Sequence, residues 1–137
     1  MASILKVDTL TGVTTAGSIS VTGEGNSTTT NLQQGLAKSW INFNGTGTIA
    51  TRDSFNISSL SDEGTGNYSV TIASAMGNTN YSVIGAVGRN SADGAMFANH
   101  IGTNANTTTT QRVKGLYVDG GLIDMTQMCS SLLGDLA

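Results

Sequence analysis

LSDEGTGNYSVTIASAMGNTNYSVIGAV, residues 60–87, is the most informative stretch of the chain. Within it, residues 68–72 alternate apolar and polar side chains, which is typical of a half-buried β-strand. Residues 81–87 repeat the alternation, and turns rich in glycine and asparagine stand before and between the two segments. Because short turns connect adjacent strands, the pattern predicts an antiparallel β-meander and not a strand–helix–strand unit.

The same alternation, with turns rich in Gly, Ser, Thr and Asn, continues through most of the chain. It predicts further strands at residues 3–8, 18–23, 37–43, 48–59 (one or two strands), 95–98, 113–118 and 122–129. The best hairpin signal is Asp119-Gly120-Gly121, because an Asp-Gly pair tolerates the positive φ of a type I′ turn. Residues 32–36 have helix-like spacing and predict one short helical turn. Residues 130–137 are too short for a stable free helix, so we expect them to fray or to dock on a neighbour.

Turns recur at roughly ten-residue spacing, which predicts an all-β fold. We expect residues 37–137 to form an antiparallel, jelly-roll-like β-sandwich. Residues 1–36 contain two short predicted strands and the polar, low-complexity stretch GEGNSTTTN. An isolated pair of strands is marginally stable in water, so we expect an extended, β-stranded N-terminal arm whose burial is completed by a partner surface.

Composition excludes several classes of function. Charged residues make up 11% of the chain, against about 25% in a typical soluble domain, so Thr, Ser and Asn must fill the surface. The net charge is −3 and the six Lys and Arg residues are scattered, which argues against nucleic-acid binding. No apolar run approaches the ~18 residues of a membrane span, so we expect no membrane insertion. The first residues do not resemble a signal peptide, which predicts synthesis in a cytoplasm without general secretion.

The residue types that carry catalysis or bind metals are sparse. His100 is the only histidine, and with Cys129 it gives two candidate ligands where structural zinc takes four. Asp62 and Glu63 are neighbours in a predicted turn, so their side chains diverge. Residues 45–50 have the glycine spacing of a dinucleotide-binding loop, but a predicted strand follows where a helix is required. We therefore expect no enzyme activity, no cofactor and no metal site, and we expect Cys129 to be a small buried side chain.

Aromatic residues on strands can either stack on sugars or fill a core. Core packing is the favoured interpretation for the four in question, with the tyrosine hydroxyls reaching the edge: Trp40, Tyr68, Tyr81 and Tyr117. The sugar-stacking alternative corresponds to a free carbohydrate-binding module.

Four segments resemble a known family. Residues 37–52, AKSWINFNGTGTIATR, resemble the KAWVNFNGTGTVAIR segment of tail fibre-like proteins from marine tailed bacteriophages, and residues 62–70 are similar to their DNGTGDYTV. Residues 75–81 are similar to their AMPDANY, with Gly77 where the family often has proline. The opening ILKVDTLTG resembles N-terminal repeats that precede this module in such phages.

The resemblance implies a β-rich virion structural protein, often trimeric, at the particle surface and assembled in the host cytoplasm. Residues 1–36 would then attach or trimerise, through Ile4, Leu5, Val7, Leu10, Ile19 and Val21. Loops carried by a rigid scaffold often bind partners, so we expect contact surfaces in three loops, at Asp62, Glu63, Asn67, Arg89, Asn90, Asp93, Asn104 and Asn106.

Two functions of a virion protein remain open at this point. The first is a trimeric, fibre-like tail appendage that contacts a host-surface glycan or protein. The second is a capsid decoration or head-fibre protein seated on the shell, because 137 residues is short for a fibre. In both cases the expected partners are sister chains and other virion proteins.

Overall fold

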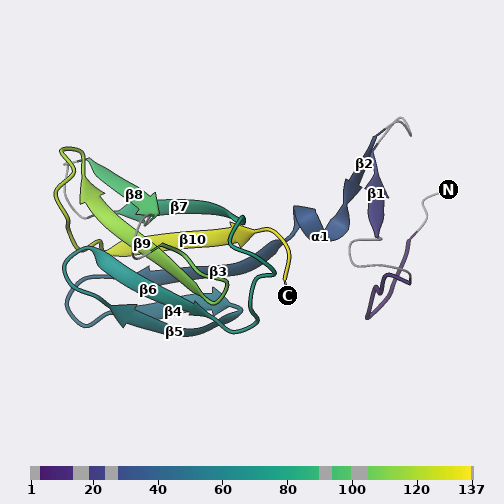
Figure 1. Ribbon diagram of the computed structural model, residues 1–137, viewed down its shortest axis with the longest axis horizontal. Coiled ribbons are helices and arrows are strands. Elements are labelled where there is room, and N and C mark those ends of the chain that lie inside the picture. The colour runs from purple at the N-terminus through teal and green to yellow at the C-terminus, as the bar shows by residue number, and fades with distance from the viewer. Residues whose placement is uncertain (1–3, 14–18, 24–27, 90–93, 100–104, 137) are drawn as a thin grey trace. The chain divides into compact units, whose positions relative to one another are not determined.

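The structure, a computed structural model, describes residues 4–13, 19–23, 28–89, 94–99 and 105–136 (Figure 1). The chain forms two compact units, residues 1–36 and residues 37–137. The larger unit consists of two packed antiparallel sheets, which confirms the predicted all-β sandwich. The finer, jelly-roll-like description stays a prediction.

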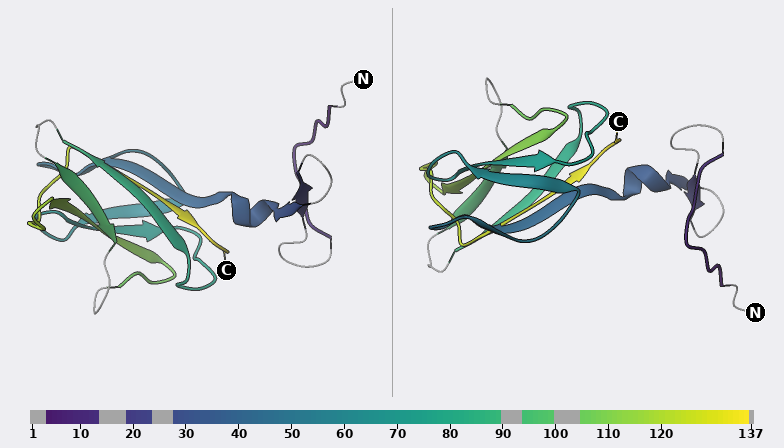
Figure 2. Two further views of the ribbon diagram at one scale, coloured as in Figure 1. Left: turned by 90° about the horizontal axis from the view of Figure 1, so that it is seen from above. Right: turned by 90° about the horizontal axis from the view of Figure 1, so that it is seen from below.

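The strands of the sandwich are β3 (Ala37–Asn44), β4 (Ala50–Phe55), β5 (Ile57–Asp62), β6 (Asn67–Ile72), β7 (Ser82–Gly88), β8 (Ala95–Asn99), β9 (Thr110–Tyr117) and β10 (Gln127–Leu133). One sheet has the order β4-β3-β10-β7, and we call it the β10 sheet. The other has the order β5-β6-β9-β8, and we call it the β9 sheet. All neighbouring strands are antiparallel, and Figure 2 shows the two layers running side by side with loops at both ends.

The core lies between the sheets and follows the period-two alternation of the strands. Its main cluster contains Ile41, Phe43, Tyr68, Val70, Val113, Met125 and Met128, all buried. The rings of Phe43 and Tyr68 meet edge to face, with centroids 5.1 Å apart. Ile41 and Phe43 therefore face inward, while Trp40 and Asn42 lie on the opposite, outer face of the β10 sheet. Fully burying one such side chain contributes about 1.5–3 kcal/mol.

The two ends of the sandwich hold different loops. At the end that we call the Gly45 end, Gly45 N–H donates to the carbonyl of Met125 and Gly115 N–H to that of Gly66. At the opposite end, the Thr107 end, the Tyr81 hydroxyl donates to the Thr107 carbonyl. This division decides which of the predicted contact loops can lie together.

Asn56 forms the corner at which the chain leaves the β10 sheet and enters the β9 sheet. Its φ is 57°, in the left-handed region that Asn tolerates better than most residues. The side-chain amide nitrogen donates to the carbonyl of Lys38 (2.9 Å), and the amide oxygen accepts from Ser74 N–H (2.7 Å). Asn56 thus fixes the crossing from one sheet to the other.

The smaller unit contains β1 (Ser20–Thr22), β2 (Thr29–Asn31) and α1 (Leu32–Gly35). The short helical turn is confirmed, and Asn31 caps it by accepting from Gln34 N–H (3.1 Å). β2 was not predicted: it lies in the polar low-complexity stretch and is held by its pairing with β1, which threonine favours.

The strand predicted at residues 3–8 is wrong over the described residues 4–8. These residues pair with no described strand, and a lone extended segment has no ladder of hydrogen bonds to hold it. Residue 3 lies outside the described residues.

The predicted meander of residues 68–72 and 81–87 is also wrong. Both strands exist, but β6 pairs with β5 and β9, whereas β7 pairs with β10 in the other sheet. The connecting residues include Met76 and Tyr81, which are buried and pack with Ile72 and Leu132. A connection that inserts side chains into the core carries the chain across the sandwich instead of turning it back.

The last strand is displaced from its predicted position. The Asp119–Gly121 turn forms, with Tyr117 N–H donating to the Gly121 carbonyl and a positive φ at Gly120. Beyond it, however, only an isolated bridge joins Leu116 to Leu122. β10 begins at Gln127 and ends at Leu133, so residues 130–133, expected to fray or dock, lie in the middle of the β10 sheet.

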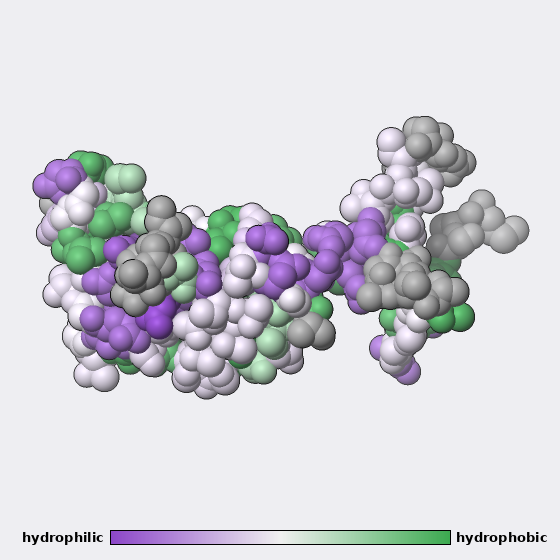
Figure 3. Space-filling view, in the orientation of Figure 1, coloured by the Kyte–Doolittle hydropathy of each residue, from purple (hydrophilic) through white to green (hydrophobic). Residues whose placement is uncertain are grey.

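The visible surface is mostly of intermediate hydropathy, as Figure 3 shows by its pale colour.

Cys129 is half-buried on the outer side of β10, opposite Asn42 and Ala86, and so is not the buried side chain that we predicted. Its thiol is free.

Candidate functional site

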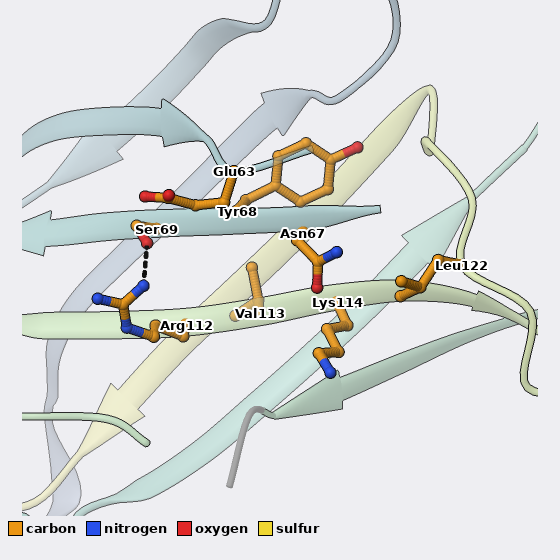
Figure 4. Close-up of a pocket in the computed structure, with 8 residues that line it drawn as sticks. All are labelled: Glu63, Asn67, Tyr68, Ser69, Arg112, Val113, Lys114 and Leu122. Carbon is orange, nitrogen blue, oxygen red and sulfur yellow. Dashed lines mark hydrogen bonds between the residues drawn. The ribbon is translucent and has the colours of Figure 1, made fainter. Parts of the chain in front are cut away.

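The outer face of the β9 sheet carries a hollow of about 520 Å³, which we call the β6–β9 hollow. Its lining is Glu63, Asn67, Tyr68, Ser69, Arg112, Val113, Lys114 and Leu122. Figure 4 shows these residues on β6, on β9 and in the segments that flank them. Two of them, Glu63 and Asn67, belong to the loop that the sequence analysis selected as a contact surface.

Strand register explains why polar side chains meet in the hollow. Asn67 is opposite Lys114, and Ser69 is opposite Arg112, in the antiparallel pairing of β6 with β9. Directly opposed residues project on the same side of a sheet, so all four lie on the outer face. The residues between them, Tyr68 and Val113, are buried in the core.

Arg112 is held at the base of the hollow. Its Nη1 donates to the hydroxyl of Ser69 (3.0 Å), and Ser69 is only 6% exposed. Its backbone N–H donates to the side-chain oxygen of Asn106 (2.7 Å), whose amide nitrogen donates to Asn99 (2.8 Å). Asn106, another predicted contact residue, thus supports the strand beside the hollow.

The loop before β6 is a set of tight turns. Asp62 accepts from Gly64 N–H (2.9 Å), so this carboxylate is engaged in the turn while Glu63 lines the hollow. The two carboxylates therefore diverge, as predicted. Gly66 has a φ of 64°, and a Cβ there would lie 2.6 Å from the carbonyl oxygen of Gly115. Only glycine fits this close approach of the loop to β9.

Asp124 and Tyr68 anchor the same loop from the core side. Asp124 accepts from Gly66 N–H (2.7 Å) and from the Tyr68 hydroxyl (3.0 Å). Burial, together with the hydrogen bond to Asp124, raises the pKa of Tyr68 well above its ordinary value. Asp124 was not selected from the sequence. The one available signal was a single acidic residue within the otherwise apolar run Leu122-Ile123-Asp124-Met125.

The predicted contact loops do not form one surface. Residues 62–67 and Arg89 lie at the Gly45 end, where the Arg89 guanidinium lies 4.5 Å from the centre of the Tyr117 ring. The segment at residues 106–110 lies at the Thr107 end. Asn90, Asp93 and Asn104 lie outside the described residues, as does His100.

The four aromatic side chains divide into two groups. Tyr68 and Tyr81 are buried, as the core interpretation predicts. Trp40 and Tyr117 are half-buried, and Trp40 lies on the outer face of the β10 sheet next to the exposed Phe55. Core packing therefore accounts for two of the four.

The selected residues of the smaller unit are mostly exposed within it. Ile4 and Leu5 are 79% and 80% exposed, and Val7, Leu10 and Val21 are also exposed. Ile19 is half-buried, and its carbonyl accepts from Leu32 N–H (2.8 Å). Their role in attachment or trimerisation stays a prediction.

Within the described ranges, no group of three or more His, Cys, Asp or Glu side chains is arranged to hold a metal ion. None of the helices in that part of the chain has the length and apolar character needed to cross a membrane.

Comparison of the chain with protein-family models, with curated proteins and with solved structures gives no match.

Proposed function

We propose that the protein is a non-enzymatic structural component of a bacteriophage virion, displayed as a trimeric, fibre-like surface appendage that aids host adsorption. Two features support the proposal. The segments that resemble phage fibre-like proteins at residues 37–52 and 62–70 cover β3, the start of β4, the β5–β6 turn and most of β6, and β3 and β6 are inner strands of their sheets. The smaller unit has apolar side chains with nothing to pack against in its described residues.

The exposed apolar side chains of residues 4–21 carry the proposal. Ile4, Leu5, Val7 and Leu10 recur within seven residues, and Val21 lies on the three-residue strand β1. Two three-residue strands cannot bury them, and an isolated hairpin is marginal in water. Packing against sister chains would contribute about 1.5–3 kcal/mol for each side chain that becomes fully buried. Closed symmetry, as in a trimer, repeats that burial in every chain.

A capsid decoration protein is the second candidate. The same apolar segment suits a seat on the shell. A carbohydrate-binding module is a candidate of another class, for which the half-buried Trp40 and the exposed Phe55, opposite each other on β3 and β4, would provide an aromatic surface.

Copy number in purified virions separates these candidates. A tail appendage is expected in a few tens of copies or fewer and a decoration protein in hundreds, counted by quantitative mass spectrometry and located by electron microscopy. A protein that is absent from virions and sediments as a monomer would instead fit the carbohydrate-binding module.

Matched variants test the role of the N-terminal segment in assembly. Replacing Val7 and Leu10 by serine removes two exposed apolar side chains, whereas replacing Thr9 and Thr11 by serine leaves the apolar set intact. We expect the first pair to give monomers in sedimentation at a concentration where the second pair remains trimeric. Equal assembly of both pairs would contradict a role for this segment.

A further inference from the structure

The β6–β9 hollow brings two cations to an otherwise acidic protein. Arg112 and Lys114 are two residues apart on β9, so both project from the outer face of the sheet. Among the described residues, no carboxylate forms an ion pair with either side chain, and Arg112 is oriented by the Ser69 hydroxyl. Two neighbouring cations on one sheet face, of which Arg112 is oriented and neither is paired with a carboxylate among the described residues, favour an anionic ligand.

The hollow also carries acceptors. Figure 4 shows Glu63 extending beside Ser69 on the wall opposite β9. The amide nitrogen of Asn67 donates to the Thr65 carbonyl (3.0 Å), which leaves its oxygen available as an acceptor. A carboxylate accepts hydrogen bonds from hydroxyl groups but repels a second anion, so the ligand must carry hydroxyls at one position and its charge at another.

The size and exposure of the β6–β9 hollow suit one unit of a polymeric ligand. The volume of about 520 Å³ lies within the range of roughly 300–1,000 Å³ that is common for small-molecule sites. The hollow is on an open sheet face with Leu122, which is 42% exposed, at its rim. A site on an exposed sheet face can accept one part of a longer polymer.

We propose that the β6–β9 hollow binds an acidic polysaccharide, with Arg112 and Lys114 on the carboxylate or sulfate group and Glu63 and Asn67 accepting from hydroxyls of the same sugar. The inference rests on the proposed function only for the statement that this polysaccharide belongs to a host surface. The binding chemistry itself depends on the hollow alone.

The test measures binding of the full-length protein to polygalacturonate, dextran sulfate and uncharged dextran by biolayer interferometry. Polygalacturonate and dextran sulfate distinguish the carboxylate from the sulfate, and binding to at least one of them is expected, with none to dextran. Lys114→Gln and Arg112→Gln should each weaken that binding by about tenfold or more, since hydrogen bonds to charged groups are the strong ones. Lys6→Gln, which removes an exposed cation of the smaller unit, is the control and should bind as the parent does.

Glu63→Ala separates a built site from general attraction between charges. Removing this carboxylate makes the protein less acidic, so general attraction predicts tighter binding, whereas loss of the acceptor oxygens for sugar hydroxyls predicts weaker binding. Weaker binding supports the proposal. The proposal is overturned if this variant binds more tightly than the parent, or if Lys6→Gln loses as much binding as the Arg112 and Lys114 variants. It is also overturned if the parent binds neither acidic polysaccharide, or binds polyglutamate, an acidic polymer without sugars, as tightly as it binds them.

Folding of the variants and the proposed function are checked separately. Lys114→Gln removes a side chain that makes no hydrogen bond or ion pair within the described part of the chain, so an unchanged melting temperature is expected even if Arg112→Gln melts earlier. Binding by a protein that is absent from virions would refute the virion role and leave the site intact. If the protein is present in virions but binds neither acidic polysaccharide, the virion role stands and the proposed binding site is refuted.

Discussion

The hydroxyl of Tyr68 donates to the carboxylate of Asp124 over 3.0 Å and joins two parts of the chain that are 56 residues apart. The same hydroxyl lies 2.9 Å from the Gly45 carbonyl oxygen. A Cβ at residue 45 would lie 2.5 Å from that hydroxyl, so only glycine leaves room for it. The two glycine-containing segments FNGTGT (residues 43–48) and GTGNY (residues 64–68) therefore meet at one buried hydrogen-bonded group.

Tyr68→Phe should destabilise the sandwich by about 1–3 kcal/mol, because it removes the one hydroxyl that the Asp124 carboxylate and the buried Gly45 carbonyl share. Urea denaturation followed by tryptophan fluorescence measures the change. Tyr117→Phe is the matched control, since the ring of Tyr117 and not its hydroxyl contacts Arg89. A Tyr68→Phe variant as stable as this control would contradict the anchoring role.

Stability should fall at alkaline pH because of the buried tyrosines. Burial raises the pKa of Tyr81 to about 12, and burial and Asp124 raise the pKa of Tyr68 further, from an ordinary value of 10.0. The folded chain thus keeps protons that the unfolded chain loses, so this contribution is complete below pH 10 and declines as the pH rises through about 12. Urea midpoints measured across this range should decline less steeply in Tyr81→Phe than in the parent. Parallel curves for the two proteins would refute the assignment.

The corner at Asn56 allows a test of backbone strain against side-chain hydrogen bonding. Asn56→Gly removes the bonds to Lys38 and Ser74 but accepts the positive φ, whereas Asn56→Ala loses the same bonds and adds strain. Both should be destabilised, with the alanine variant lower by about 1–2 kcal/mol. Chemical denaturation gives both values. Equal stability of the two variants would show that the corner relaxes.

A polar group in the core offers a route to a more stable protein. The side-chain oxygen of Gln111 accepts from the Ser130 hydroxyl (2.9 Å), but its amide nitrogen is buried without a partner among the described residues. An unpaired buried donor costs about 1–3 kcal/mol. Gln111→Met combined with Ser130→Ala removes both polar groups and should raise the melting temperature. Ser130→Ala alone, which leaves Gln111 with neither bond, should lower it.

The local alternation of side chains was sufficient to predict strands where one face of the sheet is buried and the other is not. The alternation of Ile41 and Phe43 with Trp40 and Asn42 is visible in the sequence, and the structure places these pairs on opposite faces. Which strands pair with one another was harder to predict from the sequence. β3 pairs with β10, about ninety residues further along, and no local turn signal encodes that partner.

The candidate site was predictable only in part. Glu63 and Asn67 were selected because glycine-rich turns tend to form exposed loops. Arg112 and Lys114 were counted as scattered cations, since their proximity to residues 63–69 depends on the register of β6 with β9. Arg52 was missed for the same reason: its guanidinium donates to Asn42, to the Phe43 carbonyl and to the Thr126 carbonyl, which joins β4 to the segment before β10.

The position of β10 between β3 and β7 affects when the protein can fold during its synthesis. Until residues 127–133 emerge from the ribosome, β3 and β7 have no shared neighbour and both of their inner edges are open. Pairings over such separations form slowly, and unpaired edges invite association with other nascent chains. The sandwich must therefore close after translation has passed Leu133. Until then, a cell that makes the protein has to prevent the preceding hundred or so residues from associating with other nascent chains.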